Sequence, residues 1–220
     1  MKISLIEYDA GNLPSVERAL ACQGVACERV ATADAVLGSE ALILPGVGHF
    51  GQLMRTLGAR GLIAPLADSI SRGTPLLGIC LGLQALFAGS EEAPGDAGLG
   101  LYAGQVAALP ATAKLPHMGW NQLQRKRASV LLEGVPASAY FYFAHSYAAL
   151  HQGPGGAAEA AGNAAVATCD HGAEFVAVLE QKNIFAVQFH PEKSAEAGAR
   201  VLRNFVAHAA SLQAAAQSRR

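Results

Sequence analysis

The segment GICLGLQ (residues 78–84), directly preceded by the apolar run PLL (75–77), indicates how this chain folds. The apolar run predicts a buried strand, and its continuation GICLG has the form G-x-C-x-G. This is the thiol counterpart of the G-x-S-x-G turn that holds a nucleophile between a strand and a helix. Such a sharp turn needs small residues two positions either side of the central one, because larger side chains would collide. The segment therefore predicts an α/β protein with Cys80 on a nucleophile elbow.

Cys80 has two interpretations from this segment alone. The dipole of a following helix, expected to carry Leu83, Leu86 and Phe87 on its inner face, would favour the reactive thiolate. However, cysteine is among the most buried residue types, and glycines flank many turns between strands and helices. A nucleophile also needs a base, so the rest of the chain decides between a core cysteine and a reactive one.

The first hundred residues alternate strand and helix patterns, which favours a parallel sheet covered on both faces. Strands are predicted at 2–7, 25–30, 41–45 and 75–79, and helical spacing appears at 15–20 and 52–71. Strand-like segments then follow one another at 101–109, 120–126, 139–144, 164–169, 174–181 and 184–189. We expect these to add a mixed or antiparallel portion to the same sheet.

The predicted fold class is therefore a single α/β domain with an open, mixed, mostly parallel sheet flanked by helices. The Gly- and Ala-rich stretch 151–163 is expected to be a surface loop, and the last helix to begin after Ser194. The domain is expected to span 1–213, with a frayed tail at 214–220.

Composition excludes several classes of protein. Of the 220 residues, 51% are hydrophobic and 15% charged, which is typical of a compact fold. The net charge of −1 gives no excess of positive charge with which to bind nucleic acid or an anionic membrane. No apolar stretch reaches the roughly 20 residues of a membrane span, and the N-terminus lacks a signal-peptide pattern. The four cysteines (Cys22, Cys27, Cys80 and Cys169) lack CxxC spacing, so we expect no disulfide framework and no metal site. We expect a cytoplasmic protein.

The segment HPE (190–192) supplies a candidate base at the end of a predicted strand. In an extended segment His190 and Glu192 project to the same side, and a carboxylate beside an imidazole fixes its tautomer. A solvated turn is the alternative for this segment alone, but a matched thiol and base in one α/β chain favour catalysis. His145 lies beside a serine that would face the opposite way. The other histidines (His49, His117, His151, His171 and His208) are expected on the surface or in loops.

The stretch LILPGVGHF (42–50) predicts a strand that ends in a Gly-rich loop. Such loops can point backbone N–H groups at an anion. The expected oxyanion donors are the backbone N–H groups of Val47, Gly48 and Leu81. An ordinary turn between a strand and a helix is the alternative.

Together PGVG (45–48), GICLGLQ and HPE resemble the class I glutamine amidotransferase family over almost the whole chain. The resemblance implies that Cys80 attacks the side-chain amide of glutamine, while His190 transfers protons and Glu192 orients it. It also implies glutamine-binding residues and no cofactor; the binding residues are Gly46, Gln84, Glu91, His145, Ser146 and Tyr147.

Within this family, EYDAGNL (7–13), PHMGWN (116–121), YFAHSY (142–147) and HPEKS (190–194) resemble the glutaminase subunits of imidazole glycerol phosphate synthases. Those subunits usually carry Gly where Asp9 stands here. The resemblance implies that ammonia passes to a cyclase subunit of the (β/α)8-barrel type, which makes imidazole glycerol phosphate and an aminoimidazole carboxamide ribotide in histidine biosynthesis. The residues implied to face the cyclase are Asn12, Pro116, Met118, Trp120, Tyr142 and Lys193.

Other interpretations stay open at this point. Trp120, the only tryptophan, could equally fill the core. The chain could serve another synthase, such as those for anthranilate, carbamoyl phosphate, GMP or the pyridoxal cofactor. It could also be a free-standing cysteine hydrolase, which would turn over without a partner. A domain that only binds or regulates would be expected to lose Cys80, His190 or Glu192, and all three are present.

Overall fold

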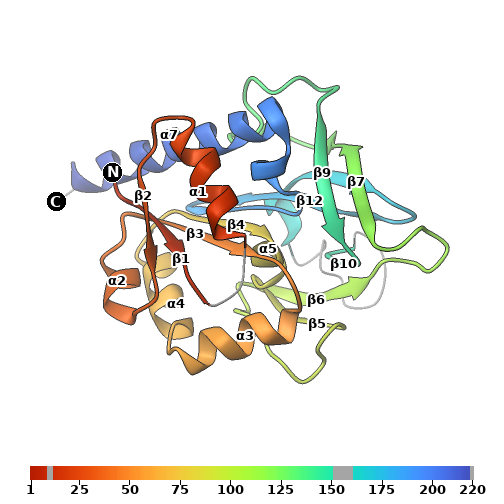
Figure 1. Ribbon diagram of the computed structural model, residues 1–220, viewed down its shortest axis with the longest axis horizontal. Coiled ribbons are helices and arrows are strands. Elements are labelled where there is room, and N and C mark those ends of the chain that lie inside the picture. The colour runs from red at the N-terminus through yellow and green to blue at the C-terminus, as the bar shows by residue number, and fades with distance from the viewer. Residues whose placement is uncertain (9–11, 151–160, 219–220) are drawn as a thin grey trace.

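The computed structural model of the protein describes residues 1–8, 12–150 and 161–218, so Asp9, His151 and most of the predicted loop at 151–163 lie outside it. Within this part of the chain, the main sheet has eight strands in the order β2-β1-β3-β4-β13-β12-β11-β8 (Figure 1). Pairing is parallel from β2 to β13 and antiparallel from β13 to β8. The strands are β1 (Ile3–Ile6), β2 (Cys27–Val30), β3 (Ala41–Gly46), β4 (Leu76–Cys80), β8 (Gln124–Arg125), β11 (Ala165–Asp170), β12 (Glu174–Gln181) and β13 (Ile184–Val187). This sheet confirms the predicted mixed α/β class.

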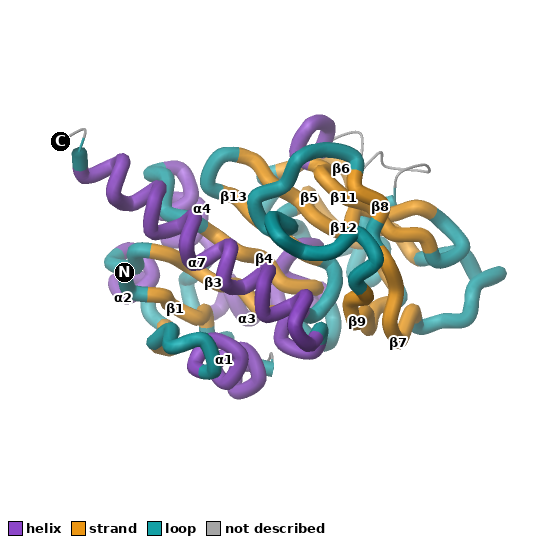
Figure 2. Tube along the Cα trace, turned by 90° about the horizontal axis from the view of Figure 1, so that it is seen from above, coloured by secondary structure: helices purple, strands orange, loops and turns teal. Residues whose placement is uncertain are grey.

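Helices cover both faces of the main sheet (Figures 1 and 2). On one face Leu5 and Ile43 pack in a core with α1 (Leu13–Ala21) and α7 (Ala195–Gln217). On the other face Ile6 and Leu42 pack in a core with α2 (Ala33–Leu37), α3 (Phe50–Ala59) and α4 (Ile63–Ser71). Alternate residues of each strand thus enter opposite cores, as the period of a strand requires. Helix α7 continues to Gln217, beyond residue 213, where the domain was expected to end.

The chain after the elbow differs from the prediction. Helix α5 is only Leu81–Gln84, and Phe87, expected on its inner face, instead opens the strand β5 (Phe87–Ser90). At the end of this short helix the carbonyl of Ala85 accepts the N–H of Leu99 at 2.7 Å, a contact with the chain that follows β5.

Two smaller sheets correct the expectation that every strand after residue 100 joins the main sheet. Strands β5, β6 (Tyr102–Ala108) and β10 (Tyr147–Ala148) form one, and β7 (His117–Gln122) pairs with β9 (Tyr140–His145) in the other. In β9 the buried Phe141 packs on Phe189 with ring centroids 4.2 Å apart, and Phe143 packs on Phe175. The β7–β9 pair therefore packs against the main sheet through aromatic side chains and does not extend it.

The elbow between β4 and α5 has the strained geometry that its sequence predicts. Cys80 has φ 54° and ψ −105°, in a region that residues other than glycine rarely adopt. A Cβ on Gly78 would lie 2.7 Å from the carbonyl oxygen of Gly82, and a Cβ on Gly82 would lie 2.0 Å from that of Leu44. Only glycine at these positions lets β3, β4 and α5 approach closely enough to form the turn.

We expect Gly82→Ala to lower the free energy of unfolding by at least about 3 kcal/mol, because the new methyl group meets backbone that cannot move aside. Gly95→Ala is the matched control, since nothing lies within 4 Å of its added Cβ. Urea denaturation measures both. Equal stability of the two variants would contradict the packing described for the elbow.

Candidate active site

The candidate nucleophile and base meet at one edge of the main sheet. Strands β3, β4 and β13 are parallel neighbours, so their carboxyl ends lie together, where open α/β sheets bind ligands. Cys80 ends β4, and His190 follows β13 by three residues. Both are buried, with 5% and 2% of their surface exposed, and both line a cavity of about 260 Å³.

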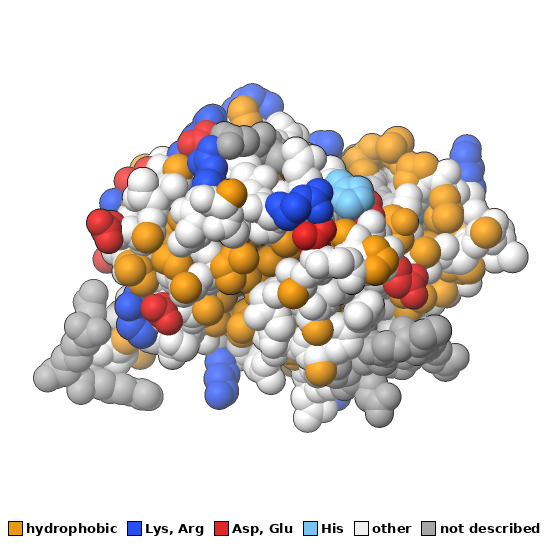
Figure 3. All heavy atoms as spheres, turned by 90° about the horizontal axis from the view of Figure 1, so that it is seen from below, with side chains coloured by type: hydrophobic (Ala, Val, Ile, Leu, Met, Phe, Trp, Pro, Cys, Tyr) orange, Lys and Arg blue, Asp and Glu red, His pale blue; other side chains and the backbone are white. Residues whose placement is uncertain are grey.

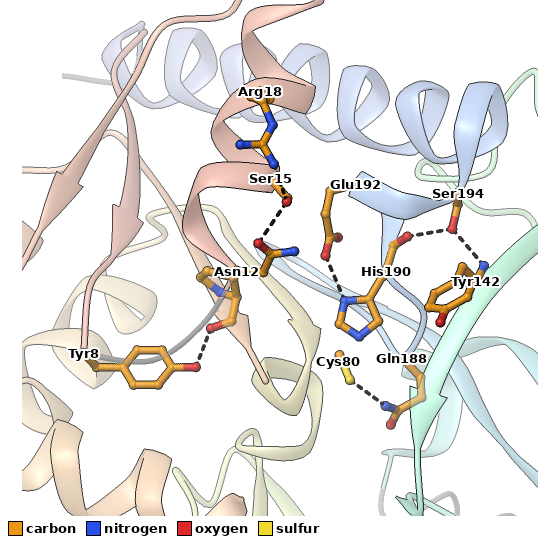
Figure 4. Close-up of polar contacts among 11 residues, drawn as sticks. Tyr8, Asn12, Ser15, Arg18, Cys80, Tyr142, Gln188, His190, Glu192 and Ser194 are labelled. Atoms are coloured by element: carbon orange, nitrogen blue, oxygen red, sulfur yellow. Dashed lines mark hydrogen bonds and ion pairs between the residues drawn. The ribbon is translucent and has the colours of Figure 1, made fainter. Parts of the chain in front are cut away.

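His190 is held between a carboxylate and the thiol (Figure 4). Its Nδ1 lies 2.9 Å from Oε1 of Glu192, and its other nitrogen points toward Cys80. Nδ1–H therefore donates to Glu192, which leaves Nε2 for the thiol proton. The two residues do share one side, as predicted, but Glu192 lies in the 3-10 turn η2 (Pro191–Lys193) and not in an extended segment.

Charges around His190 favour its protonated form. Burial alone lowers the pKa of His190, but the charge and hydrogen bond of the Cys80 thiolate, together with those of Glu192, outweigh it and raise the pKa well above its ordinary range. The Glu192 side chain is only 2% exposed, and its Oε2 accepts no hydrogen bond within the described part of the chain. The carboxylate therefore acts mainly on His190, and the arrangement supports an imidazolium at this position.

Ser194 fixes the loop that carries His190. The N–H of His190 donates to the carbonyl of Tyr142 at 2.8 Å. Ser194 Oγ donates to the carbonyl of His190 at 2.6 Å and accepts the N–H of Tyr142 at 2.9 Å. These bonds tie the loop to β9. This role of Ser194 is not predictable from the sequence, because nothing local to HPEKS shows which strand lies beside it.

The Gly-rich loop contributes Val47 and Gly48 to the cavity, and the elbow contributes Leu81. The phenol of the buried Tyr8 donates to the carbonyl of Pro45 at 2.8 Å, which ties it to the Gly-rich loop. Burial raises the pKa of Tyr8 above its ordinary range, the Val47 N–H opposes that shift, and the charge of Cys80 adds to it. Tyr8 therefore stays a phenol, and it holds the Gly-rich loop through Pro45.

Four of the predicted glutamine-binding residues line the cavity, namely Gln84, His145, Ser146 and Tyr147. Gly46 does not, because it packs behind the elbow, where an added Cβ would lie 2.5 Å from that of Leu81.

The prediction for Glu91 is wrong. Its carboxylate turns away and accepts the N–H of Ala108 at 2.9 Å, whereas its neighbour Glu92 lines the cavity and accepts the N–H of Phe50 at 2.8 Å. The acidic pair was visible in the sequence, but the short α5 and the strand β5 decide which of the two faces inward.

His117 was expected on the surface and is buried, which corrects that prediction. Its Nδ1 lies 3.2 Å from Nε2 of His145, and Nδ1 of His145 lies 2.9 Å from the carbonyl of Tyr147. Burial, with a smaller effect of neighbouring histidines, lowers the pKa of His117 to about 4 and that of His145 to about 3. Both rings are therefore neutral at pH 7, with His117 donating to His145 and His145 donating to Tyr147. This chain of bonds supports the cavity wall.

The remaining described histidines, and all of the cysteines except Cys80, lie outside the candidate site. His49 caps α3 by accepting the N–H of Gly51, His171 stacks on His117 at 4.1 Å, and His208 packs against Phe185. The cysteines are free thiols; Cys22 is exposed, Cys27 half-buried and Cys169 buried. No group of three or more His, Cys, Asp or Glu residues in the described ranges could hold a metal ion. Among the helices described, none is long and apolar enough to cross a membrane.

Met118 and Trp120 project from β7 with 65% and 52% of their surface exposed, so the core interpretation of Trp120 is wrong. Leu115 and Tyr140 are also exposed. Figure 3 shows hydrophobic side chains gathered at the end of the molecule where β7 lies. We call Leu115, Met118, Trp120 and Tyr140 the apolar face. Exposed apolar side chains that gather in this way mark interaction sites.

Comparisons with known proteins identify the family of the chain. The family described as Glutamine amidotransferase class-I matches residues 5–209. "Imidazole glycerol phosphate synthase subunit HisH" of Moorella thermoacetica is 43% identical, with 92% of this chain and 93% of that protein covered. The same subunit of Methanothermobacter thermautotrophicus is 46% identical, over 93% of this chain and 97% of that protein. Among solved structures, a glutamine amidotransferase has a TM-score of 0.71 at 20% identity, covering 94% of this chain and 98% of that one, which supports the fold alone.

Because the pKa values of the buried His117 and His145 are lowered, we expect the chain to lose stability in mild acid. Their pKa values are lower in the folded chain than the ordinary 6.5, so below about pH 6.5 the unfolded chain binds more protons. The stability is complete above that pH and falls toward pH 4, by about 1.4 kcal/mol per pH unit for each histidine. Gln at position 117 can still donate to His145. His117→Gln should therefore reduce the slope between pH 6 and 4.5 by about 1.4 kcal/mol per unit, measured by urea denaturation. Identical slopes for the variant and the wild-type chain would contradict a neutral His117.

Proposed function

The chain belongs to the class I glutamine amidotransferase family and, within it, to the imidazole glycerol phosphate synthase subunit HisH proteins, and on this premise we propose that it is the glutaminase subunit of such a synthase. It hydrolyses glutamine to glutamate and ammonia for histidine biosynthesis. The observation that carries the proposal is the buried Cys80, His190 and Glu192 arrangement around one cavity.

The proposed reaction begins with attack of the Cys80 thiolate on the side-chain amide carbon of glutamine. The oxyanion that forms faces the loop of Val47 and Gly48 and the start of α5 at Leu81. The imidazolium of His190 gives its proton to the departing amine, so ammonia leaves and a glutamyl thioester remains. His190 then removes a proton from water, the hydroxide attacks the thioester, and glutamate and the thiolate are released. Glu192 holds the imidazole in one tautomer throughout.

The oxyanion loop supports weak activity of the isolated chain. The phenol of Tyr8 holds the Gly-rich loop through the carbonyl of Pro45 at 2.8 Å. Gly48 has φ 97°, a conformation that glycine adopts readily. The peptide plane next to Gly48 can therefore rotate with little steric resistance. A partner that shifts this loop would complete the set of oxyanion donors.

Glutamine is proposed to bind with its amino group near Glu92 and its side-chain amide toward Cys80. Glu92 is the acidic residue that lines the cavity, and an ammonium group is its natural counterpart. Gln84, His145, Ser146 and Tyr147 form the remaining polar wall.

The proposed partner is a cyclase subunit of the (β/α)8-barrel type that docks on the apolar face and receives the ammonia directly. With it, the chain forms a lyase that makes imidazole glycerol phosphate and an aminoimidazole carboxamide ribotide. Asn12, Pro116 and Tyr142 are proposed to join this interface. Lys193 directly follows Glu192 and lines the cavity, and its Nζ lies 5.6 Å from the ring centre of Tyr142. A partner that contacts Tyr142 and Lys193 would therefore also contact the loop that carries His190.

Ammonia release from glutamine, with and without a barrel cyclase and its ligand, tests this function. We expect weak release by the chain alone, a large rise with the cyclase, and none from Cys80→Ala. Full activity without a partner would instead favour a free-standing hydrolase. Stimulation by a different synthetase, such as that for GMP or anthranilate, would reassign the pathway.

We expect Tyr8→Phe to raise partner-independent ammonia release about fivefold, because losing the hydrogen bond of about 1 kcal/mol to the carbonyl of Pro45 frees the Gly-rich loop to move. Tyr102→Phe is the matched control, since the buried Tyr102 hydroxyl has no hydrogen-bond partner among the described residues. Equal basal rates in both variants would contradict the role assigned to Tyr8.

We expect Glu92→Gln to raise KM for glutamine about 10- to 100-fold with little change in kcat, because it removes a charge from substrate binding and keeps an acceptor for Phe50. Steady-state kinetics of the complex measure this. Glu91→Gln is the control and should behave as wild type. The assignment fails if the two variants show the same KM.

A further inference from the structure

Gln188 is a buried amide that the mechanism above does not use. It follows β13 directly, and none of its surface is exposed. Its Nε2 lies 3.6 Å from Sγ of Cys80, a hydrogen-bond distance for sulfur (Figure 4). Gln188 precedes His190 by two residues, so both side chains leave the strand end on the same side and reach the same thiol.

The orientation of the Gln188 amide is fixed by Gln84. Oε1 of Gln188 accepts the side-chain N–H of Gln84 at 3.3 Å, and the same nitrogen of Gln84 donates to the carbonyl of Tyr147 at 2.7 Å. A flipped Gln188 amide would place two N–H donors against each other and turn an oxygen toward the sulfur. The network therefore permits one orientation, in which Gln188 presents an N–H to Cys80.

We propose that Gln188 donates its side-chain N–H to the Cys80 sulfur and stabilises the thiolate, and that Gln84 acts as a positioning residue by orienting that amide. The inference rests on the proposed function, in which the thiolate attacks glutamine. Hydrogen bonds to a charged acceptor are stronger than neutral ones, and buried groups cannot exchange them for water. The thiolate then has two donors, the imidazolium of His190 and the amide of Gln188.

Alkylation of Cys80 by iodoacetamide tests the contact without glutamine turnover. The adduct is measured on the Cys80 peptide by mass spectrometry from pH 5 to 9, so the other cysteines do not interfere. Gln188→Met keeps the approximate side-chain length but has no N–H. At the acidic end of the pH range we expect the alkylation rate of this variant to be about tenfold lower than that of the wild-type chain. The midpoint of its rate against pH should rise by about one pH unit.

Two further variants separate this role from a general loss of stability. Asn204→Leu removes two side-chain hydrogen bonds, those to the carbonyls of Leu131 and Glu133. None of these three residues lines the cavity, so this variant should keep the wild-type pH profile. Gln188→Glu still accepts from Gln84 but places a negative charge beside the sulfur, and should slow alkylation more than Met does. If Gln188→Met does not fold, the pH profile of Cys80 alkylation in Gln188→Glu is the test of the proposed contact.

Wild-type pH profiles for Gln188→Met and Gln188→Glu would overturn the proposal. The shifted profiles combined with no ammonia release by the wild-type complex would instead reject the proposed function and keep the Gln188 contact.

Discussion

The strained turn at Cys80 is the constraint on which the rest of the site depends. Its positive φ is held by the close approach of β3, β4 and α5, for which Gly78 and Gly82 leave the room. Gly46, whose Cβ would overlap Leu81, brings the Gly-rich loop against the same turn. One packing arrangement thus fixes both the thiol and the backbone expected to face the oxyanion. Backbone strain of this kind persists only where surrounding structure enforces it.

Polar contacts then arrange the residues that are proposed to react. Glu192 orients His190, His190 faces the thiol, and Ser194 ties their loop to β9. Strand β9 pairs with β7, which carries Met118 and Trp120 on the apolar face. A partner that docks on the apolar face would contact β7, whose neighbour β9 is bonded to the His190 loop. This arrangement gives a physical route by which docking could change the activity of a thiol buried in the chain.

The sequence predicts those features that depend on neighbours along the chain. The mixed α/β class, the elbow glycines and the pairing of His190 with Glu192 follow from periods and spacings of a few residues. The structure also brings Cys80 and His190 together, as the matched ends of their strands imply.

Features set by distant contacts were not predictable in this way. Glu92 replaces Glu91 at the cavity, and Glu91 instead accepts the N–H of Ala108 from the neighbouring strand β6. The contact of His117 with His145, the bond from Tyr8 to Pro45 and the bond from Tyr142 to Ser194 each join segments far apart in the sequence. No local pattern specifies such partners.

The most direct test of the central claim, that Cys80 is a nucleophile activated for glutamine, is covalent labelling with an electrophilic glutamine analogue followed by peptide mass mapping. The account predicts a single adduct on Cys80, slowed by free glutamine and absent from Cys80→Ala. An unlabelled Cys80, or labelling of Cys22, Cys27 or Cys169 in its place, would contradict it.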